Sequence, residues 1–234
     1  MLTAARGGHR HVCEWLLASD PRALHGHEIG VAARSGHLEL AEWLLHLCPV
    51  PTGGGYLFGV GYSCDLPALQ RAWARFRQPG LGPTLLDWSE DLICEAAGSP
   101  TPDWAAKVEW LEAQGCPRTS EVTWEAAGLR NDGEALARLT WLRGREYPVD
   151  ERAVDGAACA GNTAALQYLL TEVAAPAVAA DSYQLDPVLS AVKHGHLAAL
   201  QALHAARWHT RVPDAVVGAA EAGHIAHARA DLAV

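Results

Sequence analysis

Lysine, phenylalanine and methionine are scarce in this chain. Its 234 residues include two phenylalanines and one methionine, and the only lysines are Lys107 and Lys193. Alanine and leucine dominate instead, and both favour helices. Half of the residues are apolar, which is enough to build a substantial core and argues against a disordered chain. The composition therefore predicts a folded, helical protein.

Long apolar runs are also absent. No run approaches the roughly 18 residues that would suggest a membrane span, and the first 30 residues lack the apolar stretch of a signal peptide. The six cysteines are widely spaced and form no CxxC pair, which is typical of free thiols in a reducing compartment. We therefore expect a soluble, intracellular protein of the cytoplasm or the nucleus, without membrane insertion.

Basic residues are fewer than acidic ones. The net charge is −9 and the pI about 5.7. A surface of this sign repels nucleic-acid phosphates and anionic lipid headgroups. We expect no nucleic acid and no membrane among the partners, and a protein partner with some basic surface.

The motifs of common catalytic and metal sites are missing as well. There is no GxSxG elbow, no Walker loop and no complete GxGxxG turn. The stretch HEIGV at 27–31 begins like the HExxH zinc motif, but Val31 stands where the second histidine should be. HxH pairs occur at His9/His11, His25/His27 and His194/His196. None has a third ligand nearby, so we predict no catalytic residue, no metal and no cofactor.

An internal repeat is the strongest positive feature of the sequence. The clearest copies read AARGGHRHVCEWLL from residue 4, AARSGHLELAEWLL from residue 32 and AVKHGHLAALQAL from residue 191. Weaker copies bring the number to eight, starting at Ala4, Ala32, Val60, Ala96, Ala126, Ala157, Ala191 and Ala219. A motif that recurs in this way along the chain indicates an array of stacked supersecondary units.

Each copy predicts a pair of helices. The first helix ends in small residues such as Ala32-Ala33 or Ala157-Ala158, which let two helices approach closely. The second helix has an apolar face by the i, i+3, i+4 rule. In two copies this face consists of Leu40, Ala41, Leu44 and Leu45, and of Ala165, Leu166, Leu169 and Leu170. Turn formers at 49–55, 78–83 and 98–103 are expected to separate the copies.

A glycine followed by a polar residue stands between the two helices of each clear copy. These positions are Gly8-His9, Gly36-His37, Gly161-Asn162, Gly195-His196 and Gly223-His224. We expect the glycine to close the first helix in the left-handed conformation, and the next side chain to bond nearby backbone groups. Asparagine at 162 favours this structural role over a catalytic one.

The copies resemble a known family. AARSGHLELAEWLLHLC (32–48) resembles the AAxxGHxxVVxLLLxxGA half of an ankyrin repeat, and WLEAQGCP (110–117) and WLRGREYP (141–148) are similar to its end. The TPLH tetrapeptide that opens an ankyrin repeat is absent. The resemblance implies an all-α, ankyrin-like solenoid of stacked antiparallel helix pairs, with about eight repeats and irregular loops. We expect one array over 1–234, with incomplete first and last repeats.

Nine tryptophans are unusual for a chain of this length. Four occupy equivalent positions of second helices and are expected to pack in the core: Trp15, Trp43, Trp110 and Trp141. Four others lie outside that register and are candidate interface anchors: Trp88, Trp104, Trp124 and Trp208. Trp73 belongs to the degenerate third copy and has no predicted place.

The ankyrin resemblance implies a non-catalytic scaffold or adaptor for protein–protein recognition. Residues predicted at the tips of the repeats, where a partner would contact them, are His25, His27, Tyr56, Arg118, Tyr147, Tyr183, Trp208, His209 and Arg211. One alternative is a structural spacer without a dedicated partner. Another is a lipid phosphodiesterase, because tryptophan-rich arrays of this kind resemble proteins grouped with sphingomyelin phosphodiesterases.

Overall fold

The computed structural model describes residues 1–48, 53–76, 88–175 and 186–208. These residues form fourteen α-helices and one short 3-10 helix, and no strand occurs among them. The all-α prediction is confirmed for this part of the chain. The chain divides into two compact units, Met1–Pro117 and Arg118–Val234. One continuous array over 1–234 remains a prediction.

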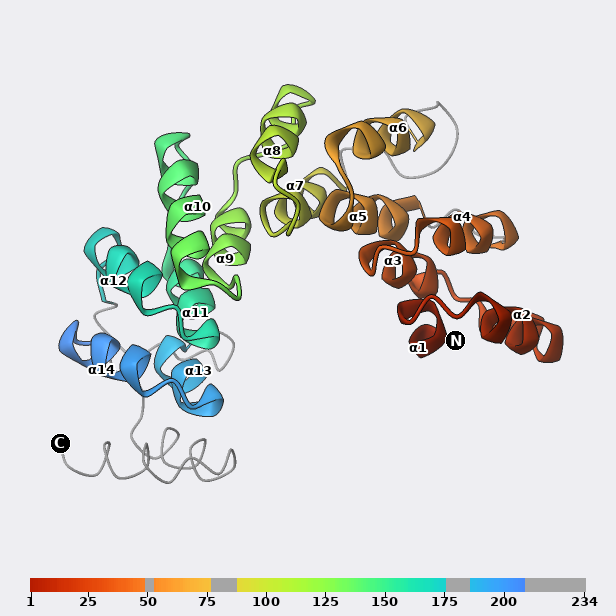
Figure 1. The fold of residues 1–234 in the computed structure, drawn as a ribbon. Helices are drawn as coiled ribbons and strands as arrows, with labels where there is room; N and C mark the ends of the chain where they lie inside the picture. Colours follow the sequence, from red (N-terminus) through yellow and green to blue (C-terminus); the bar gives the residue numbers. More distant parts are fainter. Residues whose placement is uncertain (49–52, 77–87, 176–185, 209–234) are drawn as a thin grey trace. The chain divides into compact units, whose positions relative to one another are not determined.

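The first unit contains four helix pairs (Figure 1). Their bounds are α1 Leu2–Arg6, α2 Arg10–Ser19, α3 His27–Arg34, α4 Leu38–Leu47, α5 Gly53–Ser63, α6 Leu66–Phe76, α7 Ser89–Ala97 and α8 Trp104–Ala113, with the 3-10 helix η1 at Pro21–Ala23.

The second unit contains three described pairs. Their bounds are α9 Ser120–Ala127, α10 Asp132–Gly144, α11 Glu151–Ala160, α12 Thr163–Glu172, α13 Pro187–His194 and α14 Leu197–Ala205. Seven of the eight predicted copies therefore coincide with a helix pair, and the copy at Ala219 lies outside the described residues.

Within each unit the helices form two layers (Figure 1). The first helices of successive pairs pack together, α1 on α3, α3 on α5 and α5 on α7 in the first unit, and α9 on α11 and α11 on α13 in the second. Second helices also contact each other, as α6 does α8 and α10 does α12. The predicted apolar faces of α4 and α12 are buried except for Leu45 and Leu170, which are half-buried. The core therefore lies where sequence periodicity predicts it.

The expected separator at 49–55 is wrong at its C-terminal end. Residues 53–55 are the first turn of α5. A Cβ atom on Gly30 would lie 2.9 Å from the carbonyl oxygen of Gly55, and one on Gly59 would lie 2.5 Å from the Cβ of Ala33. Glycine is therefore needed at these positions because α3 and α5 approach each other closely. Local turn propensity, on which the predicted separator was based, does not take such a contact between helices into account.

Aspartate and asparagine fix several helix starts. The side chain of Asn131 accepts the N–H of Glu134 at 2.9 Å at the start of α10. Asp186 accepts the N–H of Leu189 at 3.0 Å, and Pro187 follows it at the first position of α13. Both arrangements satisfy backbone donors that a helix leaves unpaired at its N-terminus. They set the boundaries of these helices locally.

Candidate functional site

The predicted turn glycines adopt the left-handed conformation. The φ angles are 70° at Gly8, 84° at Gly36, 73° at Gly161 and 76° at Gly195. Glycine reaches this region with little strain, so these predictions are confirmed. Gly223 and His224 lie outside the described residues.

The histidines after two of these glycines link one helix pair to the preceding pair. Nε2 of His37 donates to the carbonyl oxygen of Arg6 at 3.1 Å, and Nε2 of His196 donates to that of Cys159 at 3.1 Å. Neither histidine caps its own helix through its side chain. The expected bond to nearby backbone is therefore wrong, because the acceptor is more than 30 residues away in sequence.

Asn162 makes an equivalent link with an amide. Its Nδ2 donates to the carbonyl oxygens of Ala127 at 2.8 Å and Leu129 at 2.6 Å, at the end of α9 in the preceding pair. An asparagine can do what the histidines do because only a hydrogen-bond donor of the right reach is needed. These positions thus hold repeats together. His9, in the first pair, is exposed.

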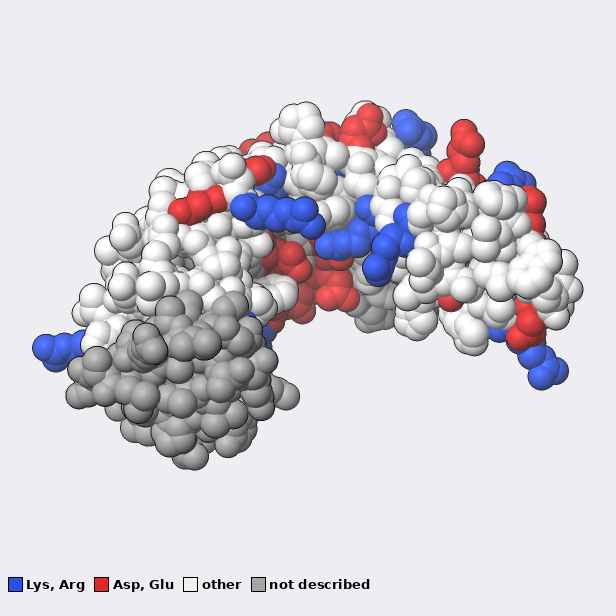
Figure 2. Space-filling model, turned by 60° about the horizontal axis from the view of Figure 1, so that its bottom comes forward, with Lys and Arg blue, Asp and Glu red and all other residues white. Residues whose placement is uncertain are grey.

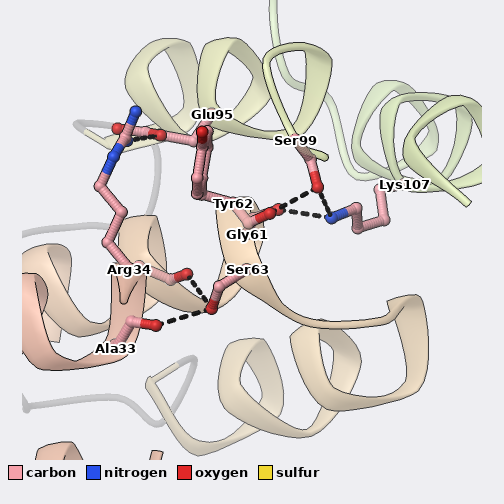
Figure 3. Close-up of polar contacts among 9 residues, drawn as sticks. Ala33, Arg34, Gly61, Tyr62, Ser63, Glu95, Ser99 and Lys107 are labelled. Atoms are coloured by element: carbon pink, nitrogen blue, oxygen red, sulfur yellow. Dashed lines mark hydrogen bonds and ion pairs between the residues drawn. The ribbon is translucent and has the colours of Figure 1, made fainter. Parts of the chain in front are cut away.

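Serines take over this role in the third and fourth copies (Figure 3). The hydroxyl of Ser63 donates to the carbonyl oxygen of Ala33 at 2.6 Å, and that of Ser99 donates to the carbonyl oxygen of Tyr62. Sequence reasoning missed both, because the GH motif is absent from these copies. The third position after the start of each copy, occupied by serine in both, is the signal that could have found them.

Lys107 adds a buried charge to the same junction. Its Nζ donates to the carbonyl oxygens of Gly61 at 2.6 Å and Cys64 at 2.9 Å, and to Oγ of Ser99 at 2.7 Å (Figure 3). The side chain is fully buried. Three acceptors replace the water that an ammonium group loses on burial. One of the two lysines is therefore a structural element of the first unit.

The first helices of successive repeats also form polar contacts with one another. In the first unit the guanidinium of Arg34 in α3 lies 3.9 Å from the ring centre of Tyr62 in α5 and forms an ion pair with Glu95 in α7 (Figure 3). One arginine thus contacts the two following first helices. Arg34 remains exposed at its edge.

The second unit repeats this arrangement with other residues. Glu121 in α9 forms an ion pair with Arg152 in α11, and Asp155 in α11 accepts the hydroxyl of Ser190 in α13 at 2.7 Å. Trp124, on the same helix as Glu121, is 40% exposed.

Burial raises the pKa of the Asp155 carboxyl above its ordinary value, and the hydrogen bond from Ser190 opposes this only in part. Acidic and basic side chains occur together on the face in Figure 2.

Cys159 and His194 form a cysteine–histidine contact in the second unit. Sγ of Cys159 lies 3.7 Å from Nδ1 of His194, which also donates to the carbonyl oxygen of Ser190 at 2.9 Å. Burial and the neighbouring Asp155 raise the pKa of the Cys159 thiol. A reactive cysteine needs a lowered pKa, so this pair has the opposite character of a nucleophile and its base. None of the six cysteines takes part in a disulfide bond, as expected.

The predicted contact residues divide into three groups. His25, His27 and Arg118 are exposed. Tyr183, His209 and Arg211 lie outside the described residues. Tyr56, Tyr147 and Trp208 are buried, with exposures of 5%, 0% and 4%, so their expected place at the surface is wrong.

A shared turn explains the burial of Tyr147 and Trp208. Each follows a residue with positive φ, 67° at Glu146 and 62° at Arg207, and each donates its N–H back to a carbonyl of the preceding helix. Cys116 is buried after Gly115 in the same way. Such turns bring an apolar residue back against the helix end. Tyr56 is instead covered next to Glu42, whose carboxylate accepts its hydroxyl at 3.1 Å.

The tryptophans of the second helices are less buried than predicted. Trp15 is 68% exposed, so its expected core position is wrong, and Trp43, Trp110 and Trp141 are half-buried. Among the candidate anchors, Trp88 and Trp104 are half-buried, and only Trp124 is exposed. Trp73 is buried, and the centre of its ring lies 5.7 Å from the centre of the Trp110 ring, with the two rings nearly perpendicular. Trp110 on α8 thus packs against a ring of the neighbouring second helix α6.

Metal-binding and membrane-spanning features were sought in the described residues. No three His, Cys, Asp or Glu side chains there are arranged to hold a metal ion. None of the helices described is long and apolar enough to cross a membrane.

Comparisons with known proteins give no relative. No protein-family model matches the sequence, and no curated protein matches it either.

Proposed function

We propose that the chain is an ankyrin-like repeat protein that binds a protein partner through the exposed surface of its first helices and adjoining turns. The observation that carries the proposal is the exposed Trp124 on α9, one helical turn from Glu121, which forms an ion pair with Arg152 of α11. Tryptophan and arginine dominate the binding energy of protein interfaces. An exposed tryptophan next to a charged pair provides both an apolar anchor and a polar rim.

Three further observations support this reading. The seven described helix pairs coincide with the predicted copies, and side-chain bonds link five of them to the preceding pair of the same unit. Stacked repeats of this type form extended surfaces suited to recognition. The raised pKa of the Cys159 thiol is unfavourable for a role of this cysteine as a nucleophile. Six cysteines without a disulfide bond favour an intracellular location.

The test is capture of partners by the purified chain and by two variants. Trp124→Ala should weaken capture by about 30-fold or more, since an interface hot spot contributes about 2 kcal/mol. Trp15→Ala is the matched control, because Trp15 is an exposed tryptophan on a second helix. It should leave capture unchanged. Cross-linking followed by mass spectrometry should place the partner on α9 and α11.

Two outcomes would contradict the proposal. Unchanged capture by Trp124→Ala, or equal loss in both variants with circular dichroism unchanged, would show that this surface is not the specific binding site. No captured protein at any salt concentration would favour the structural spacer.

A further inference from the structure

A cavity in the first unit lies away from the surface just described. It has a volume of about 200 Å³ and lies between α4, α5 and α6. Apolar side chains of Leu38, Val60, Ala68 and Ala72 form part of its wall. The polar part consists of Glu42, Tyr56, Arg71 and Arg75. It therefore combines an apolar interior with charged groups.

The volume indicates what kind of group the cavity can take. Sites for small molecules and cofactors measure about 300–1,000 Å³. At about 200 Å³ this cavity is smaller, and one amino-acid side chain is a better match than a complete cofactor. Leu38, Val60 and Ala72 would contact an aliphatic group there.

The charges indicate what should lie beside that group. Arg71 and Arg75 are one turn apart on α6, where two like charges repel and reduce helix stability. Neither forms an ion pair within the described residues, and both are exposed. Arg75 also lies over the ring of Phe76, 5.8 Å from its centre, but this contact leaves its charge without an acidic partner among the described residues. A carboxylate would relieve their repulsion and accept charge-assisted hydrogen bonds.

Glu42, the acidic residue of the cavity lining, already accepts a hydrogen bond. The hydroxyl of Tyr56 donates to Oε1 of Glu42 at 3.1 Å. Burial, and then the charge of Glu42, raise the pKa of Tyr56 to about 12, so the phenol keeps its proton and remains a donor. The lining therefore has one excess positive charge, with two arginines against one glutamate.

We propose that this cavity binds an acidic peptide segment of a protein partner, with an aliphatic side chain inside and the adjacent carboxylate on Arg71 and Arg75. The source of the segment rests on the proposed protein-binding function, whereas the ligand chemistry rests on the cavity alone. The site is a second contact, on the side of the second helices. The acidic net charge of the whole chain does not predict it.

The test uses three dipeptides with the complete, isotope-labelled chain. N-acetyl-leucyl-glutamyl amide should bind with a dissociation constant of about 1–10 mM. It should shift the arginine Nε–Hε signals and the amides of α4, α5 and α6 in NMR spectra. N-acetyl-leucyl-glutaminyl amide lacks the charge, and N-acetyl-alanyl-glutamyl amide lacks the aliphatic group. Each should bind at least about tenfold more weakly.

Variants locate the binding. Arg71→Gln and Arg75→Gln should each weaken binding of the glutamyl dipeptide at least about fivefold. Arg22→Gln is the matched control, since Arg22 is an exposed arginine of the same unit in η1. It should bind as the parent does. Circular dichroism should be the same for all variants, because the three side chains are exposed.

Defined outcomes would overturn the inference. Equal affinity for the leucyl-glutamyl and leucyl-glutaminyl dipeptides would exclude carboxylate recognition. No saturable shift up to 50 mM, or equal loss in Arg22→Gln, would exclude the cavity as a binding site; the concentration is about five times the weakest expected dissociation constant. These results do not depend on Trp124, so they separate failure of this inference from failure of the proposed function.

Discussion

At the scale of single residues, the left-handed positions determine much of the local geometry. Four turn glycines occupy this region, as the GH motif predicts. Glu146 and Arg207 occupy it as well, although side chains with a Cβ are strained there. No sequence motif predicts positive φ at Glu146 and Arg207. The structure tolerates the strain there because the residue that follows each, Tyr147 or Trp208, is buried.

Glycine at these two positions should stabilise the protein. We expect Glu146→Gly and Arg207→Gly to leave the free energy of unfolding unchanged or to raise it by up to about 1 kcal/mol each, as strain is relieved. Urea unfolding followed by circular dichroism measures the change. Gly115, in the equivalent turn, provides the reverse control: Gly115→Ala should destabilise. Destabilisation by Arg207→Gly would show that its side chain contributes more than the strain costs.

The raised pKa of Asp155 gives a pH-dependent prediction. A carboxyl with a raised pKa in the folded state adds stability below its ordinary pKa, and this contribution is lost as the pH rises through the folded value. Asp155→Asn should therefore raise the urea midpoint at pH 7. The difference should shrink as the pH falls toward about 4. Glu39→Gln, on an exposed site, is the control. A difference that grows on acidification would contradict this.

At the scale of helices, side chains connect five of the seven described pairs to the preceding pair of the same unit. Histidine, asparagine and serine all do this, by donating to carbonyl oxygens at the end of a first helix. Asp132 in α10 adds another connection, since its carboxylate accepts the N–H groups of Ala164 at 2.8 Å and Ala165 at 2.9 Å at the start of α12. Helix boundaries thus depend partly on the neighbouring repeat.

A donor should be sufficient at the histidine positions. The free energy of unfolding of His196→Asn should lie within about 0.5 kcal/mol of that of the parent, because Asn162 makes the same kind of link between repeats. His196→Leu removes the donor and should lower the free energy of unfolding by about 1 kcal/mol or more. Chemical unfolding of the three proteins checks this. If both substitutions destabilise equally, the shape of the imidazole matters more than its hydrogen bond.

The approach of α3 and α5 should not tolerate a methyl group. A Cβ on Gly59 would lie 2.7 Å from the backbone nitrogen of Arg34, so Gly59→Ala should cost about 1–3 kcal/mol. Gly144, the last residue of α10, has nothing within 4 Å of an added Cβ. Gly144→Ala is the matched control and should be neutral or stabilising by up to about 1 kcal/mol. Equal effects in thermal unfolding would contradict the tight contact.

At the scale of the whole molecule, the chain divides at Pro117 and Arg118 into two compact units. Each contains at least three helix pairs, with first helices packed against first helices. In repeat proteins each repeat contacts mainly its neighbours, so stability is gained locally along the chain. The described pairs within each unit therefore form a series of similar contacts.

Each unit should fold on its own. We expect residues 1–117 and 118–234, expressed separately, to retain helical circular dichroism and to unfold cooperatively, because each buries its own set of first-helix contacts. An equimolar mixture is the control for association between them. A fragment that is unfolded alone but folds in the mixture would favour one continuous array instead.

The sequence by itself determined the helix pairs. Small residues, left-handed glycines and the i, i+3, i+4 spacing act through local geometry, so α3 with Ala32-Ala33 and the buried face of α12 could be predicted. The tertiary structure decided which side chains remain exposed. Tyr147 and Trp208 turn back under their helices, while Trp15 is left exposed on the outside of α2. It also placed Lys107 on three acceptors and Arg71 with Arg75 at a cavity. Lys107 contacts Gly61 and Cys64, more than 40 residues away, and the cavity is lined by three different helices. Local periodicity carries no information about such arrangements.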